Sequence, residues 1–256
     1  MMENLKSLPD EWELIVVNDG STDRSLEIVQ SLEKVYSNLY ITGYPINRGR
    51  GFALRTGLAK ARGDLVITTE IDSSWGNEIA HQIVAEFEQK KDADIIVASP
   101  HLPEGGYKNV PFKRVFLSSM GNRLIRAGTS SQITMNTGMT RGYKRKKFLD
   151  LPLDEDGKEI HLEIIQKAIS LGYRIYEIPA ILEWKDKKLA SKEGVERKSS
   201  SKLNKLIRTH LIFTFLAAPF RYMYIFSGAL TFVGAIFFFG ALYNLTNPEP
   251  SIFLAI

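Results

Sequence analysis

Two acidic residues, Glu70 and Asp72, stand one residue apart directly after a short apolar run. This run, residues 65–67, is partly β-branched and follows a Gly-Asp pair, which predicts a buried strand. Ligands of open α/β sheets bind at the carboxyl ends of the strands. Mg²⁺ takes one or two protein carboxylates there and fills its other positions with water and substrate phosphates. We therefore expect Glu70 and Asp72 to hold a metal ion that bridges a diphosphate substrate; the alternative is a solvated loop.

Strands and helices alternate around this acidic pair. The first 100 residues read as four strands with helices between them, and this order predicts a parallel α/β sheet. A Gly-rich loop from Asn47 leads into one of the helices, which ends before Gly63. The expected strands are residues 12–18, 38–42, 65–67, 93–99 and 173–184, the last interrupted at Pro179, and further helices are expected over residues 77–90, 112–127 and 158–171.

The composition points to one sizeable domain and a membrane segment. The chain has 256 residues, a net charge of +4 and no cysteine, so disulfides and thiolate chemistry are excluded. Residues 223–245 carry no charge, and an apolar stretch of about 20 residues crosses a bilayer as a helix. A buried core helix is the alternative, but a core helix of this length normally shows a polar face.

The sequence before the apolar stretch is basic. Residues 185–208 are rich in Lys, Arg and Ser, which indicates a solvated loop or, next to apolar sequence, a membrane surface. Residues 203–220 are apolar but contain charges, which predicts a helix lying along the bilayer. Because cations precede the span, we expect an integral protein of the cell membrane with its N-terminal domain on the cytoplasmic face.

Several segments resemble one family. Residues 17–23 read VNDGSTD, Asn47 is followed by glycines, and the acidic pair follows a strand. This order resembles the inverting family 2 glycosyltransferases with the GT-A fold. The branch that makes polyprenyl-phosphate sugars, such as dolichol-phosphate mannose synthase, is similar in four later segments, residues 114–123, 137–143, 159–163 and 172–179.

The resemblance implies a domain organisation. It implies a GT-A domain with a mostly parallel sheet flanked by helices in residues 1–200, an interfacial helix in 201–222 and a transmembrane helix in 223–245, followed by a loop and the start of a second apolar segment in 246–256. The family opens with a strand ending in a Pro-x-Tyr-Asn-Glu type segment, so we expect the chain to be truncated at both ends. Glu70 stands where the family has Asp, and its extra methylene still allows metal contact after a backbone shift of about 1 Å.

The resemblance also implies an activity, the transfer of mannose or glucose from a nucleotide sugar (GDP-mannose or UDP-glucose) to a polyprenyl phosphate. The acceptor phosphate is already ionised, so the site must supply cations to guide it rather than a base. A homo-oligomer is compatible with this branch. The implied roles are catalytic for Asp72, Arg114 and Arg141, nucleotide-binding for Asp19, Gly20, Ser21 and Asn47, lipid-phosphate-binding for Arg123, Arg197, Lys198 and Lys202, and Mg²⁺ or Mn²⁺ binding for Glu70 and Asp72.

Other functions remain as alternatives. A GT-A transferase with a polysaccharide or glycolipid acceptor would need a general base, for which Asp154, Glu155 and Asp156 are candidates. A catalytically impaired scaffold that binds nucleotide sugars at the membrane is the other alternative. A dinucleotide-binding oxidoreductase is disfavoured because the Gly-rich loop lacks the third glycine of the fingerprint. Nucleic-acid binding is disfavoured because the basic stretches adjoin the membrane span and lack aromatic residues for base stacking.

Two residues of the expected helix 158–171 bear on the site. Glu163 has the i,i+4 spacing for an ion pair with Lys167, or for orienting one of the cations of the site. His161 has no second His or Cys at metal spacing, so it is not among the predicted metal ligands.

Overall fold

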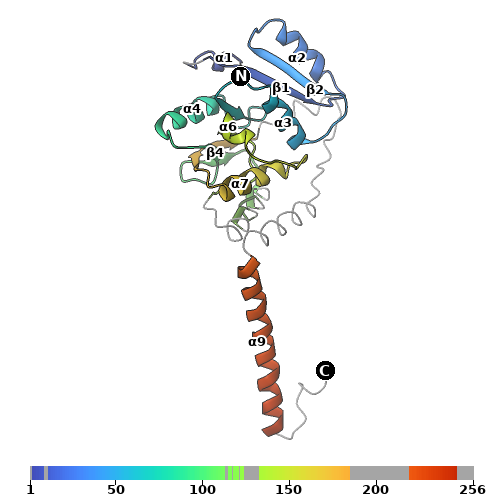
Figure 1. Cartoon of the computed structure of the whole chain (residues 1–256), viewed down its shortest axis with the longest axis vertical. Coiled ribbons are helices and arrows are strands. Elements are labelled where there is room, and N and C mark those ends of the chain that lie inside the picture. The colour runs from blue at the N-terminus through green and yellow to red at the C-terminus, as the bar shows by residue number, and fades with distance from the viewer. Residues whose placement is uncertain are drawn as a thin grey trace. The chain divides into compact units, whose positions relative to one another are not determined.

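The structure is a computed structural model that describes residues 2–8, 11–112, 115, 116, 118–120, 122, 123, 133–184 and 219–246. The chain divides into two compact units, residues 1–202 and 203–256. The first unit contains all of the described strands, and the second contains one long helix (Figure 1).

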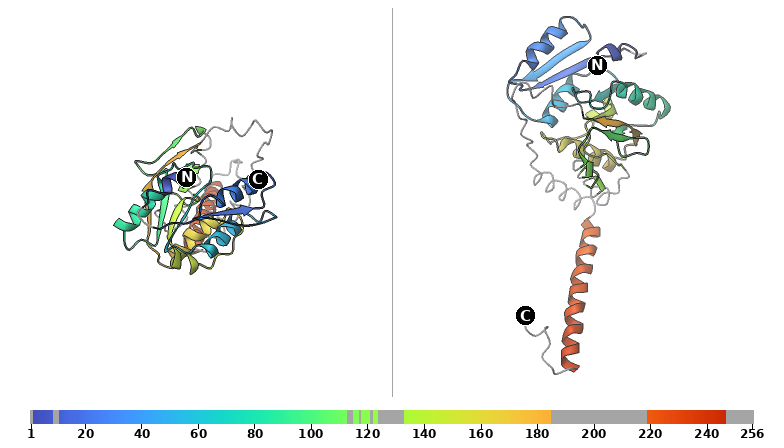
Figure 2. Two further views of the ribbon diagram at one scale, coloured as in Figure 1. Left: turned by 90° about the horizontal axis from the view of Figure 1, so that it is seen from above. Right: turned by 180° about the vertical axis from the view of Figure 1, so that it is seen from behind.

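A two-stranded parallel sheet lies at one end of the first unit. Strand β1 (Leu14–Asp19) pairs with β2 (Leu39–Tyr44), with Leu14 opposite Leu39. Helix α2 (Ser25–Glu33) packs on β2, and helix α3 (Arg50–Lys60) contacts both strands. Figures 1 and 2 show β1, β2 and α2 side by side, with the short helix α1 (Met2–Leu5) nearby. The predicted strands 12–18 and 38–42 are confirmed, with shifted ends.

A four-stranded sheet forms the centre of the unit, in the order β3-β6-β4-β7. Strands β4 (Ile95–Ser99) and β7 (Ile175–Pro179) are parallel, whereas β6 (Arg141–Lys144) is antiparallel to both β4 and β3 (Leu65–Thr68). A third, small sheet pairs β5 (Gly106–Lys108) with β8 (Ile181–Glu183) in parallel. Three of the five strand pairings among the described residues are therefore parallel, in agreement with a mostly parallel sheet.

Strand β3 differs from the prediction in its burial. It was expected to be a buried strand, but Leu65 is exposed and the following three residues are only partly buried. The reason is its position, because β3 is the edge strand of the four-stranded sheet in the described structure.

The core lies between the central sheet and its helices. Strand β4 is buried along its whole length, and it is covered by α4 (Ile79–Gln89) on a face that includes Ile83 and Phe87. Helices α6 (Arg145–Leu149) and α7 (Ile160–Ser170) contribute Phe148, Ile160, Ile164 and Ile165 to the same cluster. The predicted helices 77–90 and 158–171 are confirmed as α4 and α7, with shifted ends.

Strand β6 was missed by the sequence analysis. Its four residues, Arg141 to Lys144, read as part of a polar, basic stretch, yet Arg141, Gly142 and Tyr143 are all buried. A strand at the centre of a sheet normally shows an apolar run. Here burial is decided by neighbours that are remote in sequence.

We expect Gly142→Ala to destabilise the protein by about 1–3 kcal/mol, because a Cβ atom at this position would overlap Ile83 Cγ2 and lie 2.7 Å from Phe87 Cε2 in a packed core. The free energy of unfolding in urea measures the effect. Gly106→Ala is the matched control in strand β5, since a Cβ there meets no atom within 4 Å. Equal stability of the two variants would contradict close packing of α4 on β6.

The second unit is described through helix α9 (Pro219–Thr246). Its segment Met223–Thr246 is the one helix among the described residues that is long and apolar enough to cross a membrane, and none of it is buried. The predicted span of residues 223–245 agrees with this helix. Of the predicted interfacial helix, residues 201–218 lie outside the described residues.

Candidate functional site

The acidic segment follows β3 and is tied to the chain that enters β6. The Thr68 hydroxyl donates a hydrogen bond to Met139 O (2.6 Å), and the hydroxyls of Thr69 and Thr140 lie 3.3 Å apart. Four residues after Thr69, Ser73 adopts a left-handed conformation (φ 52°) and its N–H donates to Glu70 O (3.2 Å). This turn places Glu70 and Asp72 together at the carboxyl end of the strand.

The two carboxylates have different surroundings. Asp72 is exposed, and its Oδ1 accepts hydrogen bonds from the N–H of Ser74 (3.0 Å) and from the Ser74 hydroxyl. Glu70 is partly buried, and burial raises the pKa of its carboxyl. Arg50, with Nη1 3.9 Å from Glu70 Oε1, opposes this shift, and the negative charge of Asp72 adds to it. A cation between the carboxylates would offset both their repulsion and the loss of solvation.

The donor set fits a hard divalent cation that keeps open positions. Among the residues that the structure describes, no group of three or more His, Cys, Asp or Glu side chains is placed to hold a metal ion. Two carboxylates are nevertheless enough for Mg²⁺ or Mn²⁺ when water and substrate phosphates complete the coordination. Glu70 and Asp72 would hold the ion in this arrangement.

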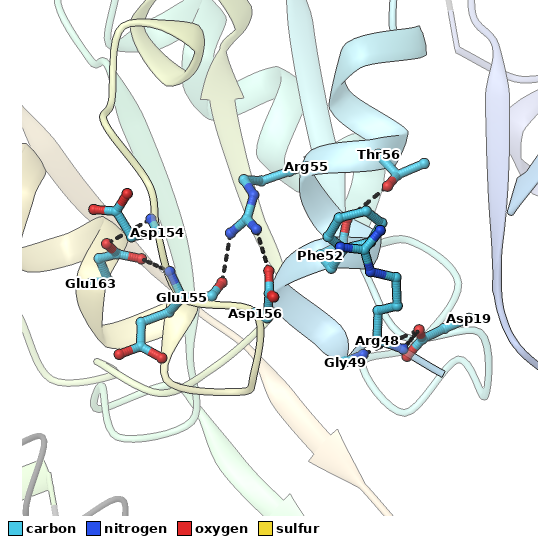
Figure 3. Close-up of polar contacts among 10 residues, drawn as sticks. All are labelled: Asp19, Arg48, Gly49, Phe52, Arg55, Thr56, Asp154, Glu155, Asp156 and Glu163. Atoms are coloured by element: carbon cyan, nitrogen blue, oxygen red, sulfur yellow. Dashed lines mark hydrogen bonds and ion pairs between the residues drawn. The ribbon is translucent and has the colours of Figure 1, made fainter. Parts of the chain in front are cut away.

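The predicted nucleotide-binding residues Asp19, Gly20 and Asn47 lie together at the end of β1. Asp19 Oδ1 accepts hydrogen bonds from the backbone N–H groups of Arg48 (2.8 Å) and Gly49 (3.2 Å), as Figure 3 shows. Asp19 Oδ2 accepts one from Asn47 Nδ2 (2.9 Å). Gly20 has φ +68°, and a Cβ atom there would overlap the Asn47 nitrogen. Asp19 thus holds the Gly-rich loop in place, and its contact with a base stays a prediction.

Ser21, the fourth predicted nucleotide-binding residue, is exposed beside this loop. Its backbone N–H donates to Asn18 Oδ1 (3.1 Å), which closes a turn after the strand. The role of Ser21 in nucleotide binding also stays a prediction.

A loop remote in sequence closes on the first turn of α3. The N–H of Gly51 donates to Asp156 O (2.7 Å), and the Arg55 guanidinium donates to Glu155 O (2.7 Å) and to the Asp156 carboxylate. A Cβ atom at Gly51 would overlap Glu155 O, so glycine is required for this approach. The three acidic residues considered as general bases thus belong to a loop docked on α3 (Figure 3).

Glu163 holds the same loop from the side of α7. Its Oε1 accepts the N–H of Asp154 and its Oε2 accepts the N–H of Glu155, both at 3.0 Å. The predicted pair with Lys167 is confirmed at 2.7 Å. The contacts with the loop were missed, although a carboxylate within the apolar run of residues 160–165 is a signal of a buried, hydrogen-bonded acid.

Arg141 lies inside the protein. Its side chain is fully buried, with Nη1 donating to His161 O (2.8 Å) and Nη2 donating to Asn136 O (2.7 Å). Burial is the largest influence on this group and lowers its pKa. We predicted a catalytic contact with substrate, but in this structure Arg141 joins the segment before β6 to the first turn of α7. Its predicted catalytic role stays a prediction.

The other predicted cations are only partly described. Arg123 is exposed, in the described part of the expected helix 112–127. Arg114, Arg197, Lys198 and Lys202 lie outside the described residues.

We expect His161 to make the protein less stable below pH 6.5. Its imidazole is buried, and neither ring nitrogen has a hydrogen-bond partner within the described ranges. Burial, reinforced by Arg141 and Arg50, holds its pKa well below the usual value. Near pH 6.5 and below, the imidazole therefore takes up a proton in the unfolded chain but not in the folded chain. The free energy of unfolding thus decreases as the pH falls, by at most about 1.4 kcal/mol per pH unit.

Unfolding in urea at pH 7.5, 6.5 and 5.5 measures this dependence. The variant His161→Gln is expected to flatten the dependence across this window, because glutamine does not titrate. An equally steep loss of stability in the variant would assign the effect to other groups.

Comparisons with known proteins agree that this chain is related to glycosyltransferases. The family model described as "Glycosyl transferase family 2" matches residues 1–151. "Dolichyl-phosphate beta-glucosyltransferase ALG5A" of Trichomonas vaginalis is 24% identical over 181 residues, which cover 68% of this chain and 54% of that protein. ALG5D of the same organism is 41% identical over 63 residues, which cover 25% of this chain and 19% of that protein. The chain thus spans about half the length, or less, of these curated relatives.

Solved structures give the fold. Glucosyl-3-phosphoglycerate synthase from Mycobacterium tuberculosis in complex with UDP is 16% identical, with a TM-score of 0.54 over 81% of this chain and 69% of that chain. The same enzyme with Mn²⁺, UDP-glucose and phosphoglyceric acid has the same identity, coverage and TM-score. This likeness shows the GT-A fold that the sequence predicted. Because the family model covers more than half of the chain, this protein belongs to glycosyl transferase family 2.

Proposed function

We propose that this protein transfers a hexose from a nucleoside diphosphate sugar to a polyprenyl phosphate at a membrane. The observation that carries the proposal is the ion pair between Arg50 and Glu70 (3.9 Å). Arg50 begins the helix that follows the Asp19-bound loop. The close approach of Arg50 to Glu70 supports a nucleotide loop that lies next to the metal carboxylates, as a nucleoside diphosphate with a bound cation requires.

The names of the relatives support a particular donor and acceptor. The curated relatives are dolichyl-phosphate beta-glucosyltransferases, and the solved neighbour is described with Mn²⁺ and UDP-glucose. We therefore favour UDP-glucose over GDP-mannose as the donor, and Mn²⁺ or Mg²⁺ as the cation. Helix α9 would anchor the protein in the bilayer that holds the acceptor, with the transferase domain on the cytoplasmic face.

Each part of the site has a task in this reaction. A bound cation would neutralise the negative charge that develops on the leaving nucleoside diphosphate. Glu70 and Asp72 hold that ion, and Asp19 fixes the backbone of the loop that receives the nucleotide. The lipid phosphate is already an anion and attacks the anomeric carbon without a base, guided by cations such as Arg123, Arg114 and Arg197.

A carbohydrate acceptor is less well supported. Its hydroxyl would need a general base, and the candidates Asp154 and Asp156 are paired with Lys167 and Arg55. These ion pairs tie the two carboxylates to cations of the protein itself. The contacts of the loop therefore favour an acceptor that carries its own negative charge.

The test is a transfer assay with the full-length protein in lipid nanodiscs that contain polyprenyl phosphate. Labelled UDP-glucose and GDP-mannose are supplied in turn, with Mn²⁺, with Mg²⁺ or with EDTA. Metal-dependent label in the lipid phase from UDP-glucose is the expected result. Absence of lipid-linked label from both donors, with folded protein, would contradict the proposal and favour a scaffold that binds nucleotide sugars.

A further inference from the structure

Arg50 lies next to Glu70, where a bound metal ion would compete with its guanidinium for the carboxylate. Its guanidinium is the one cationic group within 4 Å of Glu70 in the described part of the chain. The contact is long, at 3.9 Å, and the Arg50 side chain is 51% exposed. A pair of this kind is weak and readily opened, because solvent screens it and no close hydrogen bond holds it.

The surroundings of Arg50 do not hold it firmly. Its positive charge contributes to the lowered pKa of buried His161, so this imidazole is neutral at pH 7 and offers no charge to attract the guanidinium. A long ion pair between a half-exposed guanidinium and one carboxylate is weaker than a buried, hydrogen-bonded pair.

We propose that Arg50 takes the place of the divalent cation at Glu70 while the site is empty of substrate, and leaves Glu70 when the cation arrives. A divalent ion and a guanidinium at one carboxylate repel each other, and binding of one must weaken binding of the other. The displaced guanidinium remains beside the loop that receives the donor, where a diphosphate offers it a new anionic partner. This inference rests on the metal site of the proposed function.

Competition predicts a gain of metal affinity when Arg50 loses its charge. In a titration of the full-length protein in detergent with Mn²⁺ alone, followed by electron paramagnetic resonance, Arg50→Gln is expected to bind Mn²⁺ roughly fivefold more tightly than the wild type. Arg50→Ala is expected to give the same gain, because the charge rather than the new side chain decides it. Arg50→Lys, which keeps a cation, is expected to stay within about twofold of the wild type.

Arg48→Gln is the matched control. Arg48 is an exposed cation two residues away that stacks on Phe52, 3.4 Å from the ring centroid. Its removal changes the net charge equally, but within the described residues the ion pair of Glu70 is with Arg50 and not with Arg48. Mn²⁺ affinity in Arg48→Gln is therefore expected to match the wild type. A merely structural role of Arg50 would lower metal affinity or leave it unchanged.

The outcomes separate the inference from the function on which it rests. If the wild type binds Mn²⁺ and both Arg50→Gln and Arg50→Ala bind it no more tightly than Arg48→Gln, the inference is overturned and the metal site stands. If the wild type binds no Mn²⁺, the metal site of the proposed function is overturned, and the competition with it. Tighter binding in both Arg50→Gln and Arg50→Ala, but not in Arg48→Gln, supports the inference.

Discussion

Asp72→Asn is expected to lower hexose transfer at least about 100-fold, because the loss of charge removes one of two carboxylates proposed to hold the metal ion, and metal stabilisation of a leaving diphosphate is worth several kcal/mol. Asparagine keeps the side-chain oxygen that accepts the Ser74 N–H, so the turn is expected to persist. The measurement is kcat for lipid-linked product at saturating UDP-glucose and Mn²⁺.

Asp64→Asn is a suitable control for Asp72→Asn. Asp64 is exposed just before β3, at the opposite end of the strand from the acidic pair. The same change of charge at this end is expected to leave transfer within about twofold of the wild type, since surface substitutions away from a site have small effects. A transfer rate in Asp72→Asn close to that of Asp64→Asn would remove Asp72 from the metal site.

Glu163→Ala is expected to destabilise the protein by about 3 kcal/mol. The side chain is 2% exposed, and its removal leaves the N–H groups of Asp154 and Glu155 without their acceptor and takes one of its partners from the Lys167 ammonium. The free energy of unfolding in urea measures this loss. The stability of Glu163→Gln is expected to lie between that of the wild type and that of Glu163→Ala, because the amide oxygen of glutamine accepts a hydrogen bond from only one of the two N–H groups.

The loss of Glu163 also has an expected effect on the site. Glu163 holds the loop whose Asp156 carbonyl accepts the N–H of Gly51 in the first turn of α3. Release of this loop would loosen the start of α3, and we expect the KM for UDP-glucose to rise more than kcat falls. The control is Glu88→Ala, at an exposed acidic residue of α4. We expect this substitution to lower the free energy of unfolding by less than about 0.5 kcal/mol. Equal stability of the two variants would show that the Glu163 contacts contribute little.

Neighbouring residues in the chain were enough to predict much of the molecule. The predicted helices 77–90 and 158–171 appear as α4 and α7, and the predicted strand interrupted at Pro179 appears as β7 and β8. The acidic pair was correctly placed at the end of β3, since glycine, apolar run and carboxylates follow each other directly. The uncharged stretch predicted the long apolar helix α9. The order of the motifs indicated the family that the family model confirms.

Only the tertiary structure decided which polar groups are buried and what they contact. Arg141 reads as an available cation, yet partners 5 and 20 residues away in sequence hold it inside the protein. The role of Glu163 as the acceptor for a loop, and that of Arg50 as the partner of Glu70, likewise depend on contacts between separate elements. Local sequence sets backbone propensity and periodicity, whereas the burial of a charge depends on whether remote groups can replace its water.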